Sequence, residues 1–194
     1  MKRTFLLILF ATPLLWTSCH EDDHSGVREE LRGRFHGKYE IISAVSDTPV
    51  DLNMDGFTNT YLLDENPEIS KSEIELLVND ELNLFTGHWP IEYISNTGQE
   101  FDSSRYDPDY GISYAHYALG DAFQFNEDLT AIELLNKTPM ISNGIVDTRF
   151  VYPSAVKIES DDTITVTTQR KLYTSEGYLS VKIVARYRRY TQVT

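Results

Sequence analysis

Alternation of apolar and polar side chains near the end of the chain constrains the fold more than any other feature. Between residues 179 and 188 every second position is apolar, and polar side chains fill most of the positions between them. The apolar members are Leu179, Val181, Ile183, Ala185 and Tyr187. Successive side chains of a β-strand point to opposite sides, so a period of two is typical of a half-buried strand. This stretch therefore predicts a long strand with one face in a core.

The same pattern recurs in shorter pieces along the chain. In residues 35–45 one face carries Phe35, Tyr39, Ile41 and Val45, and His36 falls on the other. Further strands are expected at residues 73–79, 82–86, 91–95, 113–119, 122–126, 131–135, 148–152, 156–160 and 163–172. Asn, Asp and Gly between them suit tight reversals. Short helices are expected at residues 25–31 and 58–65.

Many short strands separated by frequent turns predict an all-β domain. An antiparallel meander that closes into a β-barrel would leave no exposed sheet edge. We expect a short helix just before the first strand. The chain has 194 residues, and the part from residue 33 onward is long enough for one domain with its own core. Residues 33–194 are therefore assigned to a single barrel domain.

Cys19 is the only cysteine, and it follows a segment with the order of a secretory signal. Lys2 and Arg3 come first, and the apolar run at residues 5–16 is shorter than the ~20 residues that span a membrane. A cysteine at the cleavage point resembles a bacterial lipoprotein signal. We predict a signal peptide over residues 1–18, lipidation of Cys19 and an acidic tether over residues 19–32. The alternative is an ordinary secretory signal with a chance cysteine or a buried thiol.

Charge limits the partners of the mature chain. Of 17 Lys and Arg, two leave with the signal, so 15 remain against 30 Asp and Glu, a net charge of −15. Nucleic acid is excluded, because phosphate binding needs a basic face. Acidic residues directly after Cys19 resemble a surface-export signal of lipoproteins in Bacteroidetes-type bacteria. We therefore expect a lipid-anchored outer-membrane protein displayed at the cell surface. The alternatives are a solvated linker and an inward-facing anchor.

Oxygen-bearing side chains at Asp51, Asn53 and Asp55, followed by Gly56, match the opening of a calcium loop. Three side chains at this spacing can converge on one point while glycine makes the turn. The twelfth position is Leu62, where an EF-hand has a bidentate glutamate, so the segment is not an EF-hand. A Ca²⁺ ion held by these three residues is one interpretation. An Asx-rich turn without metal is the other.

An irregular stretch at residues 98–112 is long enough to form a binding loop. Aromatic rings gather in and just after it, and such rings stack on sugars or enclose apolar ligands. The candidate ligand-binding residues are Tyr106, Tyr110, Tyr114, His116 and Trp89. The alternative is structural, because aromatic residues favour strands and fill barrel interiors.

Two segments resemble the lipocalin-like lipoproteins of Bacteroidetes. The first runs from Gly37-Lys38-Tyr39-Glu40-Ile41 through residues 49–56 to Leu62-Leu63-Asp64-Glu65, and the second is the closing hairpin at residues 171–188. The resemblance covers about a third of the mature chain. It implies a lipocalin-like barrel and an outer-membrane location.

Binding without catalysis is the expected function. The sequence contains no nucleophile elbow, glycine-rich phosphate loop or cysteine nucleophile. A barrel could take a small apolar ligand or a short glycan. The alternative is an envelope protein-interaction module in which a packed barrel is only a scaffold. A hydrolase that uses paired carboxylates is less favoured, since composition alone selects no pair.

Overall fold

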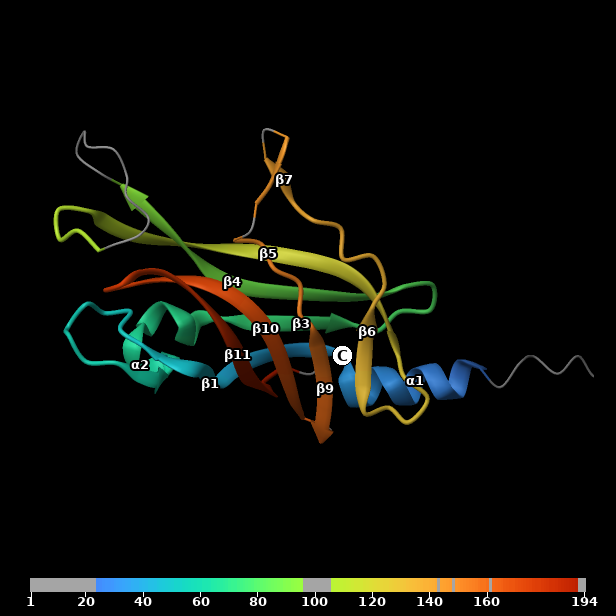
Figure 1. Cartoon of the computed structure of the whole chain (residues 1–194). Helices are drawn as coiled ribbons and strands as arrows, with labels where there is room; N and C mark the ends of the chain where they lie inside the picture. Colours follow the sequence, from blue (N-terminus) through green and yellow to red (C-terminus); the bar gives the residue numbers. More distant parts are fainter. Residues whose placement is uncertain (1–23, 96–105, 143, 148, 161, 192–194) are drawn as a thin grey trace, which may run out of the picture.

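The chain folds into a closed antiparallel β-barrel (Figure 1). The computed structural model describes residues 24–95, 106–142, 144–147, 149–160 and 162–191. Within these residues eight strands follow one another around the barrel in chain order. They are β1 (Gly37–Val50), β3 (Glu73–Leu77), β4 (Asn83–Ser95), β5 (Gly111–Phe125), β6 (Ala131–Leu134), β9 (Ala155–Ser160), β10 (Thr163–Thr174) and β11 (Gly177–Arg189). The predicted all-β meander is confirmed.

The long strand β1 closes the barrel. Its antiparallel pairing with β11 runs from Tyr39 opposite Arg189 to Ser46 opposite Ile183, with an irregularity after Ile41. On its other edge β1 pairs first with β3 and then with the short strand β2 (Asn59–Tyr61). Both edges of β1 are therefore hydrogen-bonded, and the sheet has no free edge at this point.

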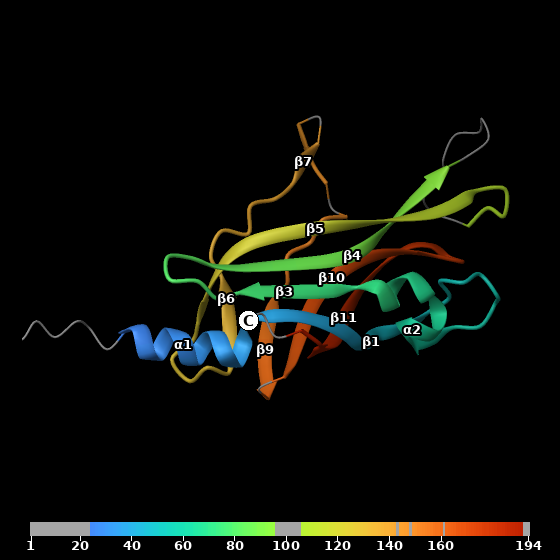
Figure 2. The same cartoon turned by 180° about the vertical axis from the view of Figure 1, so that it is seen from behind.

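Helix α1 (His24–Phe35) lies at one end of the barrel (Figures 1 and 2). Its last residue, Phe35, is buried with its ring centroid 5.0 Å from that of Phe125, and the Tyr39 hydroxyl donates to the Phe35 carbonyl at 2.7 Å. Arg189 at the end of β11 donates to the Gly33 carbonyl at 3.0 Å. These contacts fix α1 to the barrel. No helix within the described residues is both long and apolar enough to cross a membrane.

The opposite end of the barrel carries the loop at residues 51–58, in cyan in Figure 1. Beside it lie the one-turn helix α2 (Leu62–Glu65) and the 3-10 helix η1 (Pro67–Lys71). A small hairpin of β7 (Ile141–Ser142) and β8 (Ile145–Val146) stands outside the barrel wall. The barrel thus has a helix end and a loop end.

The core is the barrel interior, and the alternation at the end of the chain marks it well. In β11 the side chains of Val181, Ile183, Ala185 and Tyr187 are all buried, while Lys182, Arg186 and Arg188 are exposed. The longest predicted hairpin, β10 with β11, pairs without a break from Thr163 to Thr174.

Several local predictions were wrong. The strands expected at residues 82–86 and 91–95 are one strand, β4, and those at 113–119 and 122–126 are one strand, β5, because the two pair continuously from Asn83–Phe123 to Ser95–Gly111. No strand covers residues 149–152, and Thr148 lies outside the described residues. Only residues 62–65 of the helix expected at 58–65 are helical.

His36 is also placed differently from the sequence expectation. Helix α1 continues to Phe35, so the first strand begins at Gly37 rather than two residues earlier. His36 is buried instead of facing outward, and its Nδ1 accepts the main-chain N–H of Val78 at 3.2 Å. Strand periodicity does not apply to Phe35, which ends the helix, or to His36, which links the helix to β1.

Candidate binding site in the barrel lumen

A small cavity lies inside the barrel. Its volume is about 30 Å³, space for two or three water molecules at ~10–15 Å³ each. The wall comes from β3, β4, β5, β10 and β11, and from the irregular segment that enters β9. Its lining includes Phe85, Trp89, Leu119, Val151, Arg170 and Tyr187. Most of the lumen is thus filled by side chains, and the remaining space is mainly apolar, with Arg170, His88 and Thr168 as its polar members.

Arg170 on β10 is the cation of this cavity. Val166, Thr168 and Arg170 alternate onto the face of β10 that lines the cavity. The guanidinium carbon lies 4.8 Å from the centroid of the Trp89 ring, a cation–π geometry. Nη1 donates to the Arg149 carbonyl at 3.4 Å. Nε is buried and has no hydrogen-bond partner among the described residues.

Arg170 keeps its charge despite its position. Burial lowers the pKa of its guanidinium to about 10, against the opposing effects of Tyr187 and Glu92. A group with this pKa is protonated at neutral pH. A buried N–H without an acceptor costs roughly 1–3 kcal/mol, more when it is charged. The lumen therefore contains a charged guanidinium whose Nε–H has no hydrogen-bond acceptor among the described residues.

Glu92 on β4 is the acidic group that acts on Arg170. Burial raises the pKa of the Glu92 carboxyl, while hydrogen bonds from the main chain and the charges of Arg170 and Arg149 oppose the shift. No described carboxylate lies close enough to Arg170 to form an ion pair. Glu92 thus acts on Arg170 from a distance and leaves Nε without an acceptor.

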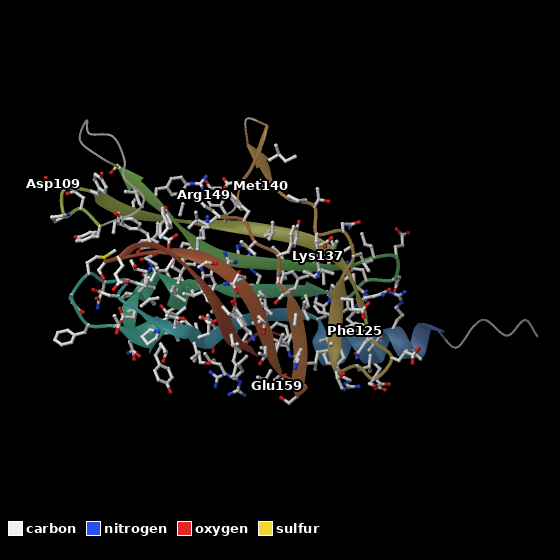
Figure 3. All side chains as sticks on the ribbon, in the orientation of Figure 1. Asp109, Phe125, Lys137, Met140, Arg149 and Glu159 are labelled. Atoms are coloured by element: carbon white, nitrogen blue, oxygen red, sulfur yellow. The ribbon has the colours of Figure 1, made fainter. Side chains whose placement is uncertain are left out.

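The segment from Arg149 to Pro153 crosses the side of the barrel and fills part of the lumen. A second space of about 10 Å³ lies between this segment, Trp89 and Arg170. Arg149 donates through Nη2 to Asp147 at 2.6 Å and lies over the Tyr93 ring at 5.2 Å. Figure 3 shows Arg149 on the side of the barrel that also carries Met140.

A row of aromatic rings leads from this segment into the barrel wall. The Tyr93 hydroxyl donates to that of Tyr117 at 2.9 Å. Tyr117 is 41% exposed, and its ring meets Phe150 edge-on at 5.2 Å. Tyr117 lies opposite Trp89 in the β4–β5 pairing. An apolar surface therefore continues from the cavity toward solvent.

The structure separates the five residues proposed from the sequence. Trp89 is buried and lines the cavity. Tyr106 packs edge-on against Tyr173, and Tyr110 is buried. Tyr114 and His116 lie on the face of β5 opposite to Tyr117. There His116 Nε2 is 3.2 Å from the Glu68 carboxylate of η1. Of the predicted loop at residues 98–112, residues 98–105 lie outside the described residues.

Sequence reasoning missed Arg170, the residue that distinguishes this cavity. A signal was present: in the alternating segment 163–172, Arg170 shares a face with Val166 and Leu172. A charged residue in register with apolar ones marks either a strand end or a buried charge. Cys19, the predicted lipidation site, lies outside the described residues.

The predicted calcium residues converge on one tight turn at the loop end. Asp51 is buried, and its two oxygens accept the main-chain N–H groups of Asp55 at 3.1 Å and Gly56 at 3.0 Å. Asn53 Nδ2 donates to the Asp55 carboxylate at 3.0 Å. The Glu65 carboxylate is buried nearby and accepts the Leu52 N–H at 3.0 Å. Within the described residues no three His, Cys, Asp or Glu side chains form a metal-binding group.

Asp51→Ala is expected to destabilise the protein by about 1–3 kcal/mol, because it leaves the Gly56 N–H without an acceptor and the Asp55 N–H with Asn53 Oδ1 alone. Asp55→Ala is the matched control and should cost less, since Asp55 is exposed. Urea denaturation measures both. The calcium site stays a prediction: it requires that millimolar Ca²⁺ raise the Tm of the wild type and leave that of Asp51→Ala unchanged. A metal-free turn requires no shift in either.

No family model, curated protein or solved structure matches this chain. What the site does must therefore follow from its own geometry. A mainly apolar cavity, an indole face and a guanidinium whose Nε lacks an acceptor among the described residues together offer recognition of a small molecule by burial and hydrogen bonding.

Proposed function

We propose that the protein is a lipid-anchored lipoprotein of the outer membrane whose barrel binds a small apolar or amphipathic ligand without catalysis. The observation that carries the proposal is the cavity inside a closed barrel, bounded by Trp89 and by Arg170, whose Nε lacks an acceptor among the described residues. Drug-sized ligands occupy ~300–1,000 Å³, whereas this cavity measures about 30 Å³. The volume favours a few buried ligand atoms over a glycan.

The position of α1 supports the anchored arrangement. α1 begins at His24, five residues after Cys19. Both views show α1 at the end of the barrel opposite the loop at residues 51–58 (Figures 1 and 2). An anchor at Cys19 would hold the helix end toward the membrane and direct the loop end away from it.

Native mass spectrometry of the protein purified from its host tests the binding. We expect the folded protein to carry an extra small-molecule mass that denaturation releases. Thr168→Phe, which fills the cavity from β10, should lose this mass at a cost in stability of about 1–3 kcal/mol. A wild-type mass equal to that of the lipidated chain alone, before and after denaturation, would contradict the proposal.

A second candidate function is an interaction module at the loop end. Phe57 is 77% exposed and Tyr61 is 59% exposed, both beside the turn that contains Asp51. Exposed aromatic side chains are enriched at protein interfaces. In this case a Phe57→Ser, Tyr61→Ser double variant would lose a protein partner in cross-linking of intact cells, and Thr168→Phe would retain it. If the lumen is the functional site, Thr168→Phe loses the bound small molecule, and the Phe57→Ser, Tyr61→Ser double variant keeps it.

A further inference from the structure

We infer that Arg170 is the head-group anchor of the lumen, and that it binds the carboxylate of a small amphipathic acid whose apolar part lies against Trp89. The inference rests on the proposed function and names the ligand class. It assigns a role to a cation that the fold holds only loosely: besides its contact with the Trp89 ring, Arg170 forms one long hydrogen bond, to the Arg149 carbonyl, and no ion pair with a described residue.

The free edge of the guanidinium suits a carboxylate. Nη1 is turned to the Arg149 carbonyl, so Nε and Nη2 form the remaining edge, and the Nε proton has no acceptor. A carboxylate accepts two parallel hydrogen bonds from such an edge, the strong bidentate geometry. It would also neutralise a half-buried charge that has no ion-pair partner among the described residues. A single carboxylate would thus supply both a hydrogen-bond acceptor for Nε and a negative charge beside the guanidinium.

The surroundings favour a monoanion with an apolar tail. Phe85, Leu119 and Val166 line the same cavity. A divalent phosphate would bring two charges to one cation in this apolar space, and it would lie in the field of the Glu92 carboxyl. A carboxylate brings one charge. Its tail can follow the aromatic surface from Trp89 toward Phe150, which borders the adjoining space.

Trp89 makes the test direct. The chain has two tryptophans, and Trp16 lies in the predicted signal peptide. In the full chain that carries Trp16→Phe, tryptophan fluorescence reports Trp89 alone. The probes are hexanoate and 1-hexanol, which share a tail and differ in the acid, together with inorganic phosphate. We expect hexanoate to bind more tightly than 1-hexanol, and phosphate not to bind.

Arg170→Gln should weaken hexanoate binding at least about tenfold and weaken 1-hexanol binding much less, because the alcohol carries no charge. Arg186→Gln, which removes an exposed cation from neighbouring β11, is the matched control and should change neither. Arg170→Met serves as a second variant, and its Tm should not fall, because it removes a cation that has no ion-pair partner among the described residues and a buried Nε–H that has no acceptor.

The outcomes separate the two proposals. Equal binding of hexanoate and 1-hexanol, or equal hexanoate binding by wild type and Arg170→Gln, overturns the carboxylate inference while lumen binding stands. Phosphate binding as tight as that of hexanoate also overturns it. Failure of both hexanoate and 1-hexanol to bind, at any concentration that leaves the protein folded, removes the proposed function as well.

Discussion

Replacing Cys19 by alanine is expected to move the protein from the membrane fraction to the soluble fraction of its bacterial host. The predicted anchor is a set of acyl chains on this residue, and each buried methylene contributes ~0.8 kcal/mol to membrane binding. Loss of two or more chains therefore removes nearly all of the affinity. The net charge of the chain is −13, which opposes binding to anionic lipid through its surface. Fractionation followed by immunoblotting measures the change.

Ser18→Ala is the matched control, because it alters the neighbouring residue and leaves the acceptor cysteine in place. This variant should remain in the membrane fraction. Globomycin, which blocks lipoprotein signal cleavage, should cause the precursor to accumulate in the wild type. A Cys19→Ala protein that stays in the membrane fraction, or a precursor that globomycin does not affect, would contradict the lipid anchor.

Gly37→Ala is expected to destabilise the barrel by about 2–4 kcal/mol. Gly37 begins β1 with φ of +146°, a region that other residues avoid. A Cβ at this position would lie 2.2 Å from the Thr191 carbonyl oxygen. That part of the chain is held by Lys38, whose N–H donates to the Thr191 hydroxyl at 3.0 Å and whose carbonyl accepts the Tyr190 N–H at 3.0 Å. The methyl group would therefore disturb the chain end beside the β1–β11 closure.

Gly33→Ala provides the control for this prediction. Gly33 lies in α1, and nothing is within 4 Å of a Cβ built there. Alanine is favoured over glycine in a helix by roughly 0.5–1 kcal/mol, so this variant should be as stable as the wild type or more stable. Urea denaturation gives both values. Equal stability of the two variants would show that the Gly37 backbone is not constrained as described.

The barrel could be predicted because its buried faces follow simple alternation. Val181, Ile183, Ala185 and Tyr187 show the pattern in sequence and are buried in the structure. The ends of the strands were harder to predict from the sequence. Two expected strands ended at residues 86 and 119, yet Gly87 and Gly120, which follow them, are each paired within a continuous ladder between β4 and β5. A ladder is fixed by the partner strand, which a local pattern does not contain.

The lumen site was harder to predict, because it depends on contacts between distant segments. Trp89 was identified by its residue type. Arg170 meets it across 81 positions of sequence, and the main chain that accepts from Arg170 belongs to residue 149. The segment after residue 148 reads as a strand from its apolar residues, but Pro153 and the turn at Arg149 keep it irregular. Local secondary-structure propensity predicts neither the path of this segment through the lumen nor the missing acceptor at Arg170 Nε.

Closure of the sheet between β1 and β11 is the central claim, because it creates the lumen in which Arg170 and Trp89 meet. Val45 and Val184 lie directly opposite each other in this pairing. In a chain that carries Cys19→Ala, we predict that cysteines at these two positions form a disulfide on mild oxidation, detected by its faster migration on a non-reducing gel. Moving the second cysteine to Ala185 reverses its face and should abolish the cross-link. No cross-link between positions 45 and 184, or equal cross-linking of both pairs, would contradict the closed barrel.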